Sequence, residues 1–307
     1  MRNKLFYSIN DVLRERFGTK IIKLSLDGGF SCPNRDGSKG NGGCIFCSDA
    51  GSGEFAGSRK HSIQKQAQSQ VELLRSKWKD AGYIAYFQNF TNTYASVDHL
   101  RTLYDEALAV EGVVGLAIAT RPDCLDEDVL NLLQEYNKKT FLWVELGLQS
   151  IHKKTADLIR RGYDLPVFDQ AIKQLNARHL KSVVHLILNL PNENFSDMEN
   201  SLRYVCDAGV WGIKLQMLNI LHRTDMALYY EKSPFYLRTA DEYIELVSHL
   251  LTKAPADIVI HRLTGDGDKK SLIAPRWVLN KRYVLNGIQK YMREHGMYQG
   301  KFHDDIS

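Results

Sequence analysis

Apolar residues along the chain gather in short runs, and each run is followed by a longer segment in which they recur with the period of a helix. The runs are rich in β-branched and aromatic residues, so they predict strands, and the segments between them predict helices. The predicted strands lie at residues 20–26, 82–90, 113–120, 141–148, 182–190 and 212–220. Strands that alternate with helices predict a parallel sheet that is buried on both faces.

Two architectures satisfy this alternation, a doubly wound sheet and a (β/α) barrel. In both, functional side chains gather at the carboxyl ends of the strands, so polar residues there are the first candidates for a site. Capping-box spacing predicts two helix starts, one at Ser196 with Glu199 and one at Thr239 with Glu242.

The alternation loosens after about residue 225, although "DIVIHRLTG" predicts one more strand and "NKRYVLNGIQKYMREHG" a final helix. We therefore expect a basic N-terminal segment at 1–19, a core at 20–225 and a C-terminal α/β extension at 226–307 that closes or flanks the sheet. The Gln-rich tract at 64–70 is expected to lie on the solvated face of a helix.

The composition is that of an ordinary globular protein. Its 307 residues, 44% of them hydrophobic, suffice for one barrel-sized domain or two smaller ones. No stretch approaches the roughly 18 apolar residues of a membrane helix, and the N-terminus lacks the apolar core of a signal peptide, so a cytoplasmic location without membrane contact is expected. The net charge of +4 is compatible with an acidic partner such as RNA but is too small to indicate one.

Three of the five cysteines lie in the glycine-rich loop after the first predicted strand, where Cys32, Cys44 and Cys47 have the spacing C-x11-C-x2-C. A sparse, odd set of cysteines favours metal or catalytic use over a disulfide framework. Structural zinc normally takes four protein ligands and would need another, such as His61. A redox Cys-x-x-Cys pair leaves Cys32 without a role. A four-iron cluster held by three thiolates leaves one iron open for a substrate or cofactor.

This loop resembles the cluster loop of radical S-adenosylmethionine (SAM) enzymes in a wide-spaced form, and Phe46 is the aromatic residue that is usual before the last cysteine. "ATRPDCL" and "WVELGLQS" are similar to segments of radical SAM proteins of the elongator catalytic subunit type. "CPNRDGSKGNGGCIFC", "YFQNFTNTY" and "HRLTGDGDK" together resemble one bacterial family of that type, the YtqA/YhcC-like radical SAM proteins.

The resemblance implies a partial (β/α)6 TIM-like barrel with a [4Fe–4S] cluster and SAM as cofactors, and an electron donor such as flavodoxin or ferredoxin. In such enzymes SAM chelates the open iron and is split by one electron to a 5′-deoxyadenosyl radical. Cys32, Cys44 and Cys47 then correspond to the cluster ligands, and Phe46 to the residue whose neighbouring backbone meets the adenine. The protein's task is to orient the cofactor and shield the radical.

Further candidates for SAM contacts follow the second and third predicted strands. Relatives hold the SAM amino group with a Gly-Gly-Glu-like turn, where this chain has Gln88, Asn89 and Asn92. One of these amides is expected to replace the glutamate, or else all three cap the loop. The planar guanidinium of Arg121 is able to bind a carboxylate. That carboxylate belongs either to SAM or to Asp123, two residues away, in a local ion pair.

Three more candidates belong to the fourth and fifth predicted strands. Glu145 interrupts an apolar strand and needs a polar partner, which is either SAM or an internal cation. Gln149 ends the same strand and either contacts SAM or caps the next helix. His185 is expected to be a satisfied core histidine, with a SAM or substrate contact as the alternative.

Other positions depart from the family pattern or have two open roles. Asn192 replaces a usual glycine, and because asparagine tolerates a left-handed backbone we expect the turn to survive, while close approach of a ligand is put in doubt. Cys124 and Cys206 are expected to be structural. His261 and Arg262 form a polar cluster that either meets substrate phosphate or metal, or shapes a turn.

Basic residues at both ends of the chain bear on the substrate. Residues 1–25 and the predicted final helix interleave Lys and Arg with aromatic residues, which is typical of a phosphate-binding face or of a solvated surface. The elongator-type relatives modify wobble uridines of tRNA, so the resemblance implies modification of a tRNA wobble uridine side chain. Radical chemistry on a small metabolite or peptide, and a non-catalytic zinc-binding or RNA-binding module, are the alternatives.

Overall fold

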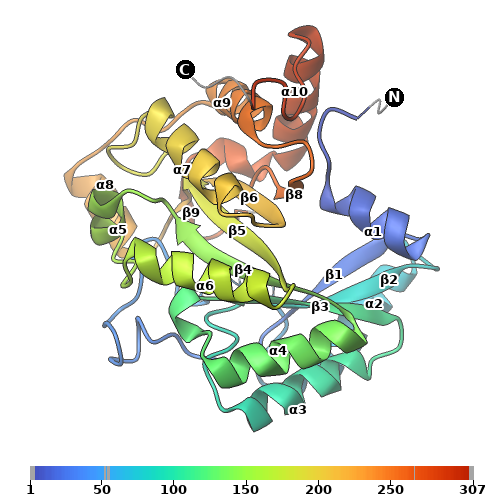
Figure 1. Cartoon of the computed structure of the whole chain (residues 1–307). Helices are drawn as coiled ribbons and strands as arrows, with labels where there is room; N and C mark the ends of the chain where they lie inside the picture. The colour runs from blue at the N-terminus through green and yellow to red at the C-terminus, as the bar shows by residue number, and fades with distance from the viewer. Residues whose placement is uncertain (1–3, 52, 54–55, 266, 304–307) are drawn as a thin grey trace.

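The fold is taken from a computed structural model that describes residues 4–51, 53, 56–265 and 267–303 (Figure 1). In this part of the chain seven parallel strands form one sheet in the order β1-β2-β3-β4-β5-β6-β8. Each strand therefore pairs with the next one along the chain, without the reversal of order that defines a doubly wound sheet. The arrangement is a partial barrel. Its strands are β1 (Ile21–Leu26), β2 (Gly82–Phe87), β3 (Val113–Thr120), β4 (Phe141–Gln149), β5 (Lys181–Leu188), β6 (Gly212–Met217) and β8 (Val259–Arg262).

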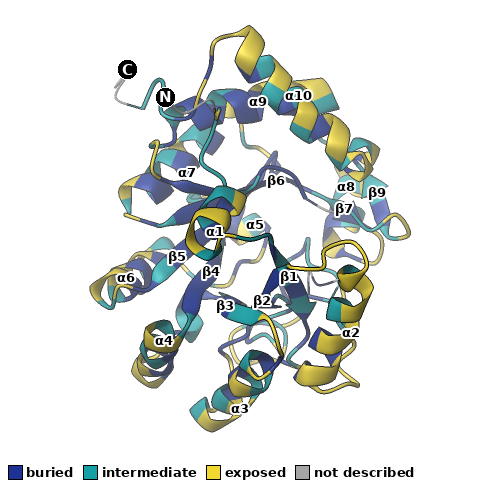
Figure 2. Ribbon diagram, turned by 90° about the vertical axis from the view of Figure 1, so that its right-hand side faces the viewer, coloured by how far each residue is buried: buried dark blue, intermediate teal, exposed yellow. Residues whose placement is uncertain are grey.

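Helices cover the outer face of the sheet, and in Figure 2 their buried residues lie on the side that faces the sheet. This places a continuous apolar layer between strands and helices, as expected for a parallel sheet buried on both faces. The helices are α1 (Ile9–Phe17), α2 (Ile63–Arg75), α3 (Val97–Leu108), α4 (Glu127–Lys139), α5 (Lys153–Leu158), α6 (Leu165–Ala177), α7 (Phe195–Asp207), α8 (Asp225–Lys232), α9 (Ala240–Lys253) and α10 (Lys281–Glu294), with 3-10 turns η1 (Pro122–Cys124) and η2 (Arg276–Leu279).

The N-terminal segment closes the end of the barrel opposite the functional strand ends. The backbone N–H of Ile260 in β8 donates to the carbonyl of Tyr7 at 2.8 Å, so the segment before α1 lies along the free edge of β8. Helix α1 packs Ile9 and Leu13 into an aromatic cluster inside the barrel that includes Trp143. These apolar side chains fill this end of the barrel.

The predicted strands are confirmed, and all six begin within one residue of their expected start. The capping box of Thr239 with Glu242 is also confirmed, at the start of α9. The one expected at Ser196 with Glu199 is wrong, because the side chain of Asn194 accepts the N–H of Asp197 and starts α7 two residues earlier.

The Gln-rich tract forms part of α2 as expected, but its glutamines are not all solvated. Gln66 is buried, and its amide bonds to the backbone N–H and carbonyl of Asp27 at 2.9 and 3.0 Å. Gln70 bonds to the backbone N–H and carbonyl of Ser25 at 2.9 and 2.8 Å. Since β1 is an edge strand, these side chains satisfy backbone groups that would otherwise be exposed for pairing with another chain.

The C-terminal extension contributes to the barrel itself. Its strand β8 pairs in parallel with β6, and a second, antiparallel sheet joins β7 (Ile220–Leu221) to β9 (Leu272–Ala274). The boundaries expected at residues 19 and 225 remain predictions. Among the described helices, none is both long and apolar enough to cross a membrane.

Candidate active site

The cysteine loop between β1 and α2 is hydrogen-bonded to the segments that follow β4 and β6. The N–H of Ile45 donates to the carbonyl of Ile159 at 3.1 Å, and the N–H of Met226 donates to the carbonyl of Ile45 at 2.8 Å. The amide of Asn34 donates to the carbonyl of Arg160 at 2.7 Å. These contacts join three parts of the chain, so the loop has a defined position over the barrel.

A glycine and an arginine shape the turn that carries the second and third cysteines. Gly43, directly before Cys44, has φ +81°, and a Cβ there would lie 2.9 Å from the side chain of Arg35. Only glycine satisfies both conditions without strain. Arg35 in turn donates to the carbonyls of Cys47 and Ser48 at 3.1 and 2.5 Å. The left-handed backbone of Gly43 therefore sets the direction of the turn, and the hydrogen bonds from Arg35 hold it in place.

All three thiols of this loop line one cavity together with Phe46, and we call this set, Cys32, Cys44, Phe46 and Cys47, the cysteine end. Burial raises the pKa of the Cys44 thiol to about 12, and the neighbouring sulfurs of Cys47 and Cys32 add to that effect. Such a thiol becomes a thiolate ligand only where a metal displaces its proton.

Three thiols on one loop match the number of protein ligands of a [4Fe–4S] cluster that has one open iron. Within the described part of the chain, no three His, Cys, Asp or Glu side chains converge as ligands of one ion. Three thiolates of a [4Fe–4S] cluster bind different irons and need not converge on one point. His61 is exposed, which gives no support to a zinc site that includes it. Cys124 is half-buried with its sulfur 3.9 Å from Asp123, outside the residues that line the cavity.

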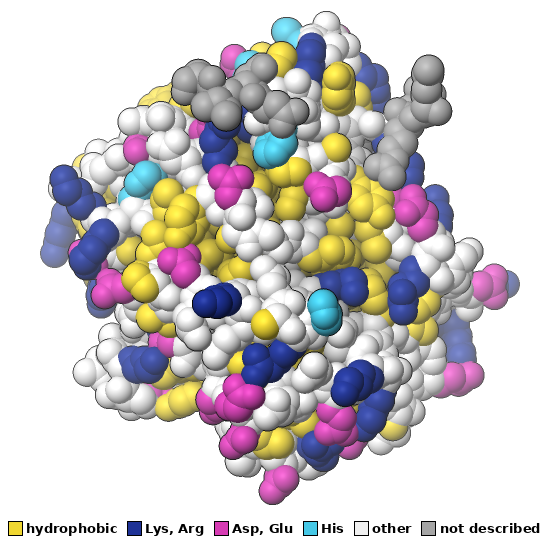
Figure 3. All heavy atoms as spheres, in the orientation of Figure 1, with side chains coloured by type: hydrophobic (Ala, Val, Ile, Leu, Met, Phe, Trp, Pro, Cys, Tyr) yellow, Lys and Arg dark blue, Asp and Glu magenta, His cyan; other side chains and the backbone are white. Residues whose placement is uncertain are grey.

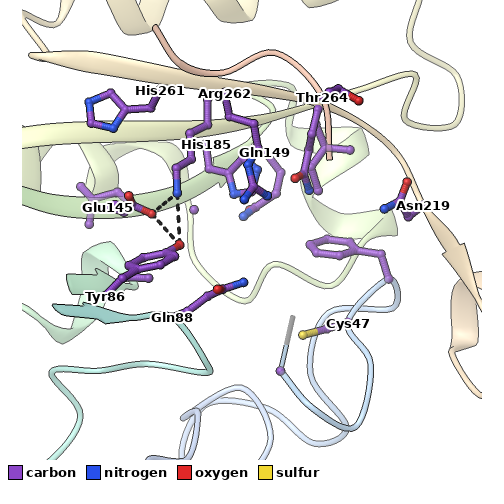
Figure 4. Close-up of a pocket in the computed structure, with 18 of the residues that line it drawn as sticks. Cys47, Tyr86, Gln88, Glu145, Gln149, His185, Asn219, His261, Arg262 and Thr264 are labelled. Atoms are coloured by element: carbon purple, nitrogen blue, oxygen red, sulfur yellow. Dashed lines mark hydrogen bonds and ion pairs between the residues drawn. The ribbon is translucent and has the colours of Figure 1, made fainter. Parts of the chain in front are cut away.

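The cavity extends from the cysteine end into the barrel and has a volume of about 850 Å³. This lies toward the upper end of the roughly 300–1,000 Å³ of ligand sites, so a cofactor and part of a substrate can share it. Figure 4 shows Cys47 on one side of the cavity and Glu145 with Tyr86 on the other. Among the predicted residues, Gln88, Arg121, Glu145, Gln149 and His185 all line it.

Charged residues on the strands form the opposite side, and we call Lys23, Tyr86, Glu145 and Lys214 the lysine end. The carboxylate of Glu145 accepts from Tyr86 at 2.8 Å and from the Trp143 indole at 2.9 Å, and it pairs with Lys214 and, at 3.5 Å, with Lys23. Burial would raise the pKa of Glu145, but the two lysines hold it well below its usual value. Glu145 thus has the internal ion pair that was one of its two expected roles, and a SAM contact remains a prediction.

Arg121 directs its fork at Asp123, with both nitrogen–oxygen distances at 2.9 Å. Its remaining nitrogen donates to the carbonyl of Arg161 at 2.8 Å. Burial alone would raise the pKa of Asp123, but the bonds from Arg121 and Lys39 bring it below the usual value. Lys39 belongs to the cysteine loop and donates to Asp123 at 2.9 Å. The ion pair of Lys39 with Asp123 therefore fixes this loop to the end of β3.

The three amide side chains after β2 have different surroundings. Gln88 lines the cavity, while Asn89 donates to the carboxylate of Asp27 at 3.1 Å. Asn92 is fully buried and donates to the carbonyl of Ala119 at 2.8 Å. The Oδ1 of Asn92 is buried and has no hydrogen-bond partner among the described residues, but Asn92 does not line this cavity, whereas Gln88 does. A SAM contact of either amide remains a prediction.

Gln149 and His185 present polar atoms to the cavity. The Gln149 Oε1 and the His185 Nε2 are buried and have no hydrogen-bond partner among the described residues. His185 has a side-chain hydrogen bond with Gln216 but leaves Nε2 without a described partner, and a SAM or substrate contact of this residue remains a prediction. Burial and the neighbouring cation of Lys214 lower its pKa to about 3, so the imidazole is neutral. Gln149 does not cap the next helix, whose N-cap is His152.

The remaining predicted positions divide between cavity and turn. His261 and Arg262 both line the cavity, as does Asp268, which shapes a turn by accepting the N–H of Ser271 at 3.0 Å. Of the polar cluster around them, residue 266 lies outside the described residues. Asn192 has φ +67°, so the left-handed turn expected there is confirmed.

Sequence reasoning missed Lys23, Tyr86 and Lys214. Lys214 interrupts the apolar strand "GIKLQM" just as Glu145 interrupts its own, and both are buried. The same signal could therefore have found it. Lys23 was counted with the basic N-terminal residues, but it lines the cavity.

Comparisons with known proteins bear on this site. Residues 37–205 match the Radical SAM superfamily and residues 210–294 match the Radical_SAM C-terminal domain. The chain is 45% identical to the YtqA protein of Bacillus subtilis (strain 168), over 97% of its own length and 93% of that protein. It is 36% identical to the YhcC protein of Escherichia coli (strain K12), over 96% and 94% of the two chains.

More distant similarities extend to archaeal proteins. The chain is 22% identical to the tRNA uridine(34) acetyltransferase of Methanocaldococcus infernus, over 60% of this chain and 34% of that protein. The solved structure of Elp3 from the same species matches with a TM-score of 0.69 and 15% identity, over 92% of this chain and 64% of the Elp3 chain. At this identity the structural likeness shows the fold.

The sequence matches cover nearly the whole chain, and the cysteine spacing, the partial barrel and the shared cavity agree with them. The chain belongs to the radical SAM superfamily, within it to the family of YtqA and YhcC, whose cofactors are a [4Fe–4S] cluster and SAM.

Proposed function

We propose that this radical SAM enzyme modifies the side chain of the wobble uridine of tRNA. The observation that carries the proposal is the similarity to the tRNA uridine(34) acetyltransferases of two archaea over 60% of the chain. That similarity is distant, so the substrate is inferred from it together with the surroundings of the cavity.

The proposal assigns a role to the residues of the cysteine end and to Gln88. Cys32, Cys44 and Cys47 hold the cluster, and Phe46 lies next to the backbone that meets the adenine. When bound, the cluster and SAM supply a 5′-deoxyadenosyl radical that takes a hydrogen atom from the substrate. Gln88 lines the cavity, and its amide oxygen is the proposed acceptor for the SAM ammonium. A flavodoxin or ferredoxin supplies the electron.

Other lining residues orient the cofactor and exclude water. Gln149 offers a buried oxygen that has no partner among the described residues, and His185 offers a neutral imidazole nitrogen. Glu145 stays ionised between its lysines, and Arg121 holds the cysteine loop through Asp123. The apolar side chains of Ile9 and Leu13 fill the end of the barrel under α1.

The mouth of the cavity supports a large, anionic substrate. Its lining includes Asn10 of α1 on one side and Lys281 and Gln289 of α10 on the other. Helix α10 also carries exposed Arg282 and Lys290, which are able to contact RNA phosphates. On the face shown in Figure 3, basic and acidic side chains are interspersed, so the proposed RNA contact rests on α10 rather than on the net charge.

Nucleoside mass spectrometry of tRNA from a deletion strain tests the proposal. We expect a changed profile of C5-substituted uridines that is restored by the wild-type chain but not by Cys44→Ala. An unchanged profile would remove the tRNA substrate while leaving the radical SAM assignment intact.

A binding experiment tests the docking of RNA at α10. The double variant Arg282→Ala/Lys290→Ala is expected to weaken tRNA binding and to lower the slope of log K against log salt by about one for each phosphate group that the variant no longer binds. The matched control Lys138→Ala/Lys173→Ala removes two exposed lysines from α4 and α6. Equal weakening in both variants would contradict a specific role of α10.

A further inference from the structure

The lysine end of the cavity holds more positive than negative charge. Lys23 of β1, Lys214 of β6 and Arg262 of β8 all line it. The one carboxylate that faces them among the described lining residues is Glu145, because Asp268 is engaged in the turn after β8. Two lysines on two separate strands therefore share this single acid.

Other basic residues of the cavity have partners that account for them. Arg121 pairs with Asp123. Arg35 donates to the carbonyls of the cysteine loop, and Arg161 donates to the carbonyls of Leu148 and Ser150 at 3.0 and 2.6 Å. These arginines build the walls of the cavity. The two lysines, in contrast, share one carboxylate.

The geometry of the two lysines leaves capacity for another acceptor. An ammonium has three donor hydrogens. Lys214 directs two of them at Glu145 and at the hydroxyl of Tyr86, which is 3.1 Å away. Lys23 reaches Glu145 at 3.5 Å and lies 5.1 and 5.0 Å from the ring centres of Tyr86 and Trp143. Each lysine thus holds a donor that these contacts do not use.

Burial makes this surplus of charge unfavourable unless an anion joins it. Lys214 is 2% and Glu145 5% exposed, and a buried cation without a full counter-charge is destabilising. Burial lowers the pKa of Lys214 to about 7 despite the opposing effect of Glu145, and Lys23 and Arg262 lower it further. The Nε2 of His185, also buried and without a described partner, faces the same space.

We propose that the lysine end binds an anionic group of the substrate, a carboxylate or a phosphate, between Lys23 and Lys214. Held there, the substrate spans the cavity and presents its reacting carbon toward the cysteine end. The inference rests on the proposed function only in placing a substrate in this cavity, and it applies to any substrate with such a group. SAM is not the expected occupant, because its carboxylate chelates the cluster iron at the cysteine end.

The test is a binding measurement that needs neither RNA nor turnover. The chain has four tryptophans, and the indole of Trp143 bonds to Glu145. In holoenzyme labelled with 5-fluorotryptophan, the 19F signal of Trp143, assigned with Trp143→Phe, reports on the lysine end. Sodium acetate and inorganic phosphate are titrated separately in the presence of SAM, with sodium chloride as the control for ionic strength.

We expect acetate, phosphate or both to shift the Trp143 signal in a saturable manner. Lys23→Gln should raise the dissociation constant about tenfold, as for loss of a charge-assisted hydrogen bond. Lys281→Gln makes the same change of charge at the mouth of the cavity and should leave the constant unchanged. The anion whose titration saturates identifies the group that the lysine end binds, which is either a carboxylate or a phosphate.

Three results would overturn the proposal. They are a Trp143 signal that responds to neither anion beyond the chloride control, equal weakening by Lys23→Gln and Lys281→Gln, and a response that appears in a repeat titration without SAM but not in its presence. None of these results changes the tRNA profile of a deletion strain, so failure here is distinct from failure of the proposed function.

Discussion

The cysteine end and the lysine end line the same cavity but are built by different means. The cysteine end lies on a loop of more than thirty residues, where Gly43 and Arg35 fix the turn around Cys44 and Cys47. The lysine end lies on the strands, where Glu145 and Lys214 are fixed by the ladder itself. The first is a set of thiols that is proposed to hold the cluster, and the second is a set of charges that partly satisfy one another. Variants should therefore affect the first through cofactor binding and the second through folding stability.

The largest expected effect is the loss of the cluster. Cys47→Ser removes a thiolate from the cysteine end and should abolish both the brown colour of the reconstituted protein and its SAM cleavage. Cys124→Ser, a half-buried thiol outside the cavity lining, serves as the control and should retain both. Iron and sulfide assays with the visible absorption spectrum check this. A cluster that persists in Cys47→Ser would show that the ligands are assigned incorrectly.

The next effect concerns stability at the lysine end. Glu145→Gln leaves two buried lysines without their acid and should lower the free energy of unfolding by about 3 kcal/mol in a denaturant titration. Adding Lys214→Met should recover part of this loss because it removes one of the unpaired charges. Glu135→Gln changes an exposed ion pair with Arg101 and should have no measurable effect. If Glu145→Gln were as stable as the wild type, the ion pair would not hold the lysine end together.

A smaller effect is expected where the two ends are linked. Arg121→Lys keeps the charge but loses the planar fork toward Asp123, which should destabilise the protein by about 1–2 kcal/mol. That corresponds to a fall in Tm of about 2–8 °C for a domain of 150–250 residues. Arg178→Lys, at the surface pair with Glu127, is the control for a surface arginine. Equal Tm values for the two variants would contradict a structural role of the fork.

The smallest effect is on pH dependence. Burial lowers the pKa of Lys214 from 10.5 to about 7, so its proton is present below that pH and is lost above it. A carboxylate keeps its charge over this range and binds the protonated form, so acetate affinity should be constant below pH 7 and fall several-fold by pH 8.5. Since Lys23, Tyr86, Glu145, His185, His261 and Arg262 also face this space, the titration is repeated in Lys214→Gln, where the decline should disappear. Tighter binding at high pH would contradict this charge assignment.

The sequence predicted the strands for a physical reason, and it also marked the three cysteines that the fold brings to the cavity. Strand starts are set by local apolar runs, and Cys32, Cys44 and Cys47 stand in a spacing that few other sites share. The choice of a barrel over a doubly wound sheet came from the pairing of β6 with β8 and the consecutive strand order, which local patterns do not determine.

Partners of the polar residues could not be predicted in the same way. Glu145 was recognisable as a buried acid, but Lys214 lies 69 residues away, and a one-dimensional pattern does not reveal that they pair. In the sequence, Gln88 and Asn92 were equal candidates for a SAM contact. The fold places Gln88 in the cavity lining, whereas Asn92 donates to the carbonyl of Ala119. Side-chain direction is set by tertiary packing, so it decides which polar residues belong to a site.

The central claim is that Cys32, Cys44 and Cys47 hold a [4Fe–4S] cluster that cleaves SAM. Its most direct test is anaerobic reconstitution with iron and sulfide, followed by dithionite and SAM, with detection of 5′-deoxyadenosine by mass spectrometry. The wild-type protein should become brown and release 5′-deoxyadenosine, and Cys44→Ala should do neither. Stoichiometric zinc in the purified protein, with no cluster formed and no 5′-deoxyadenosine released, would contradict the account.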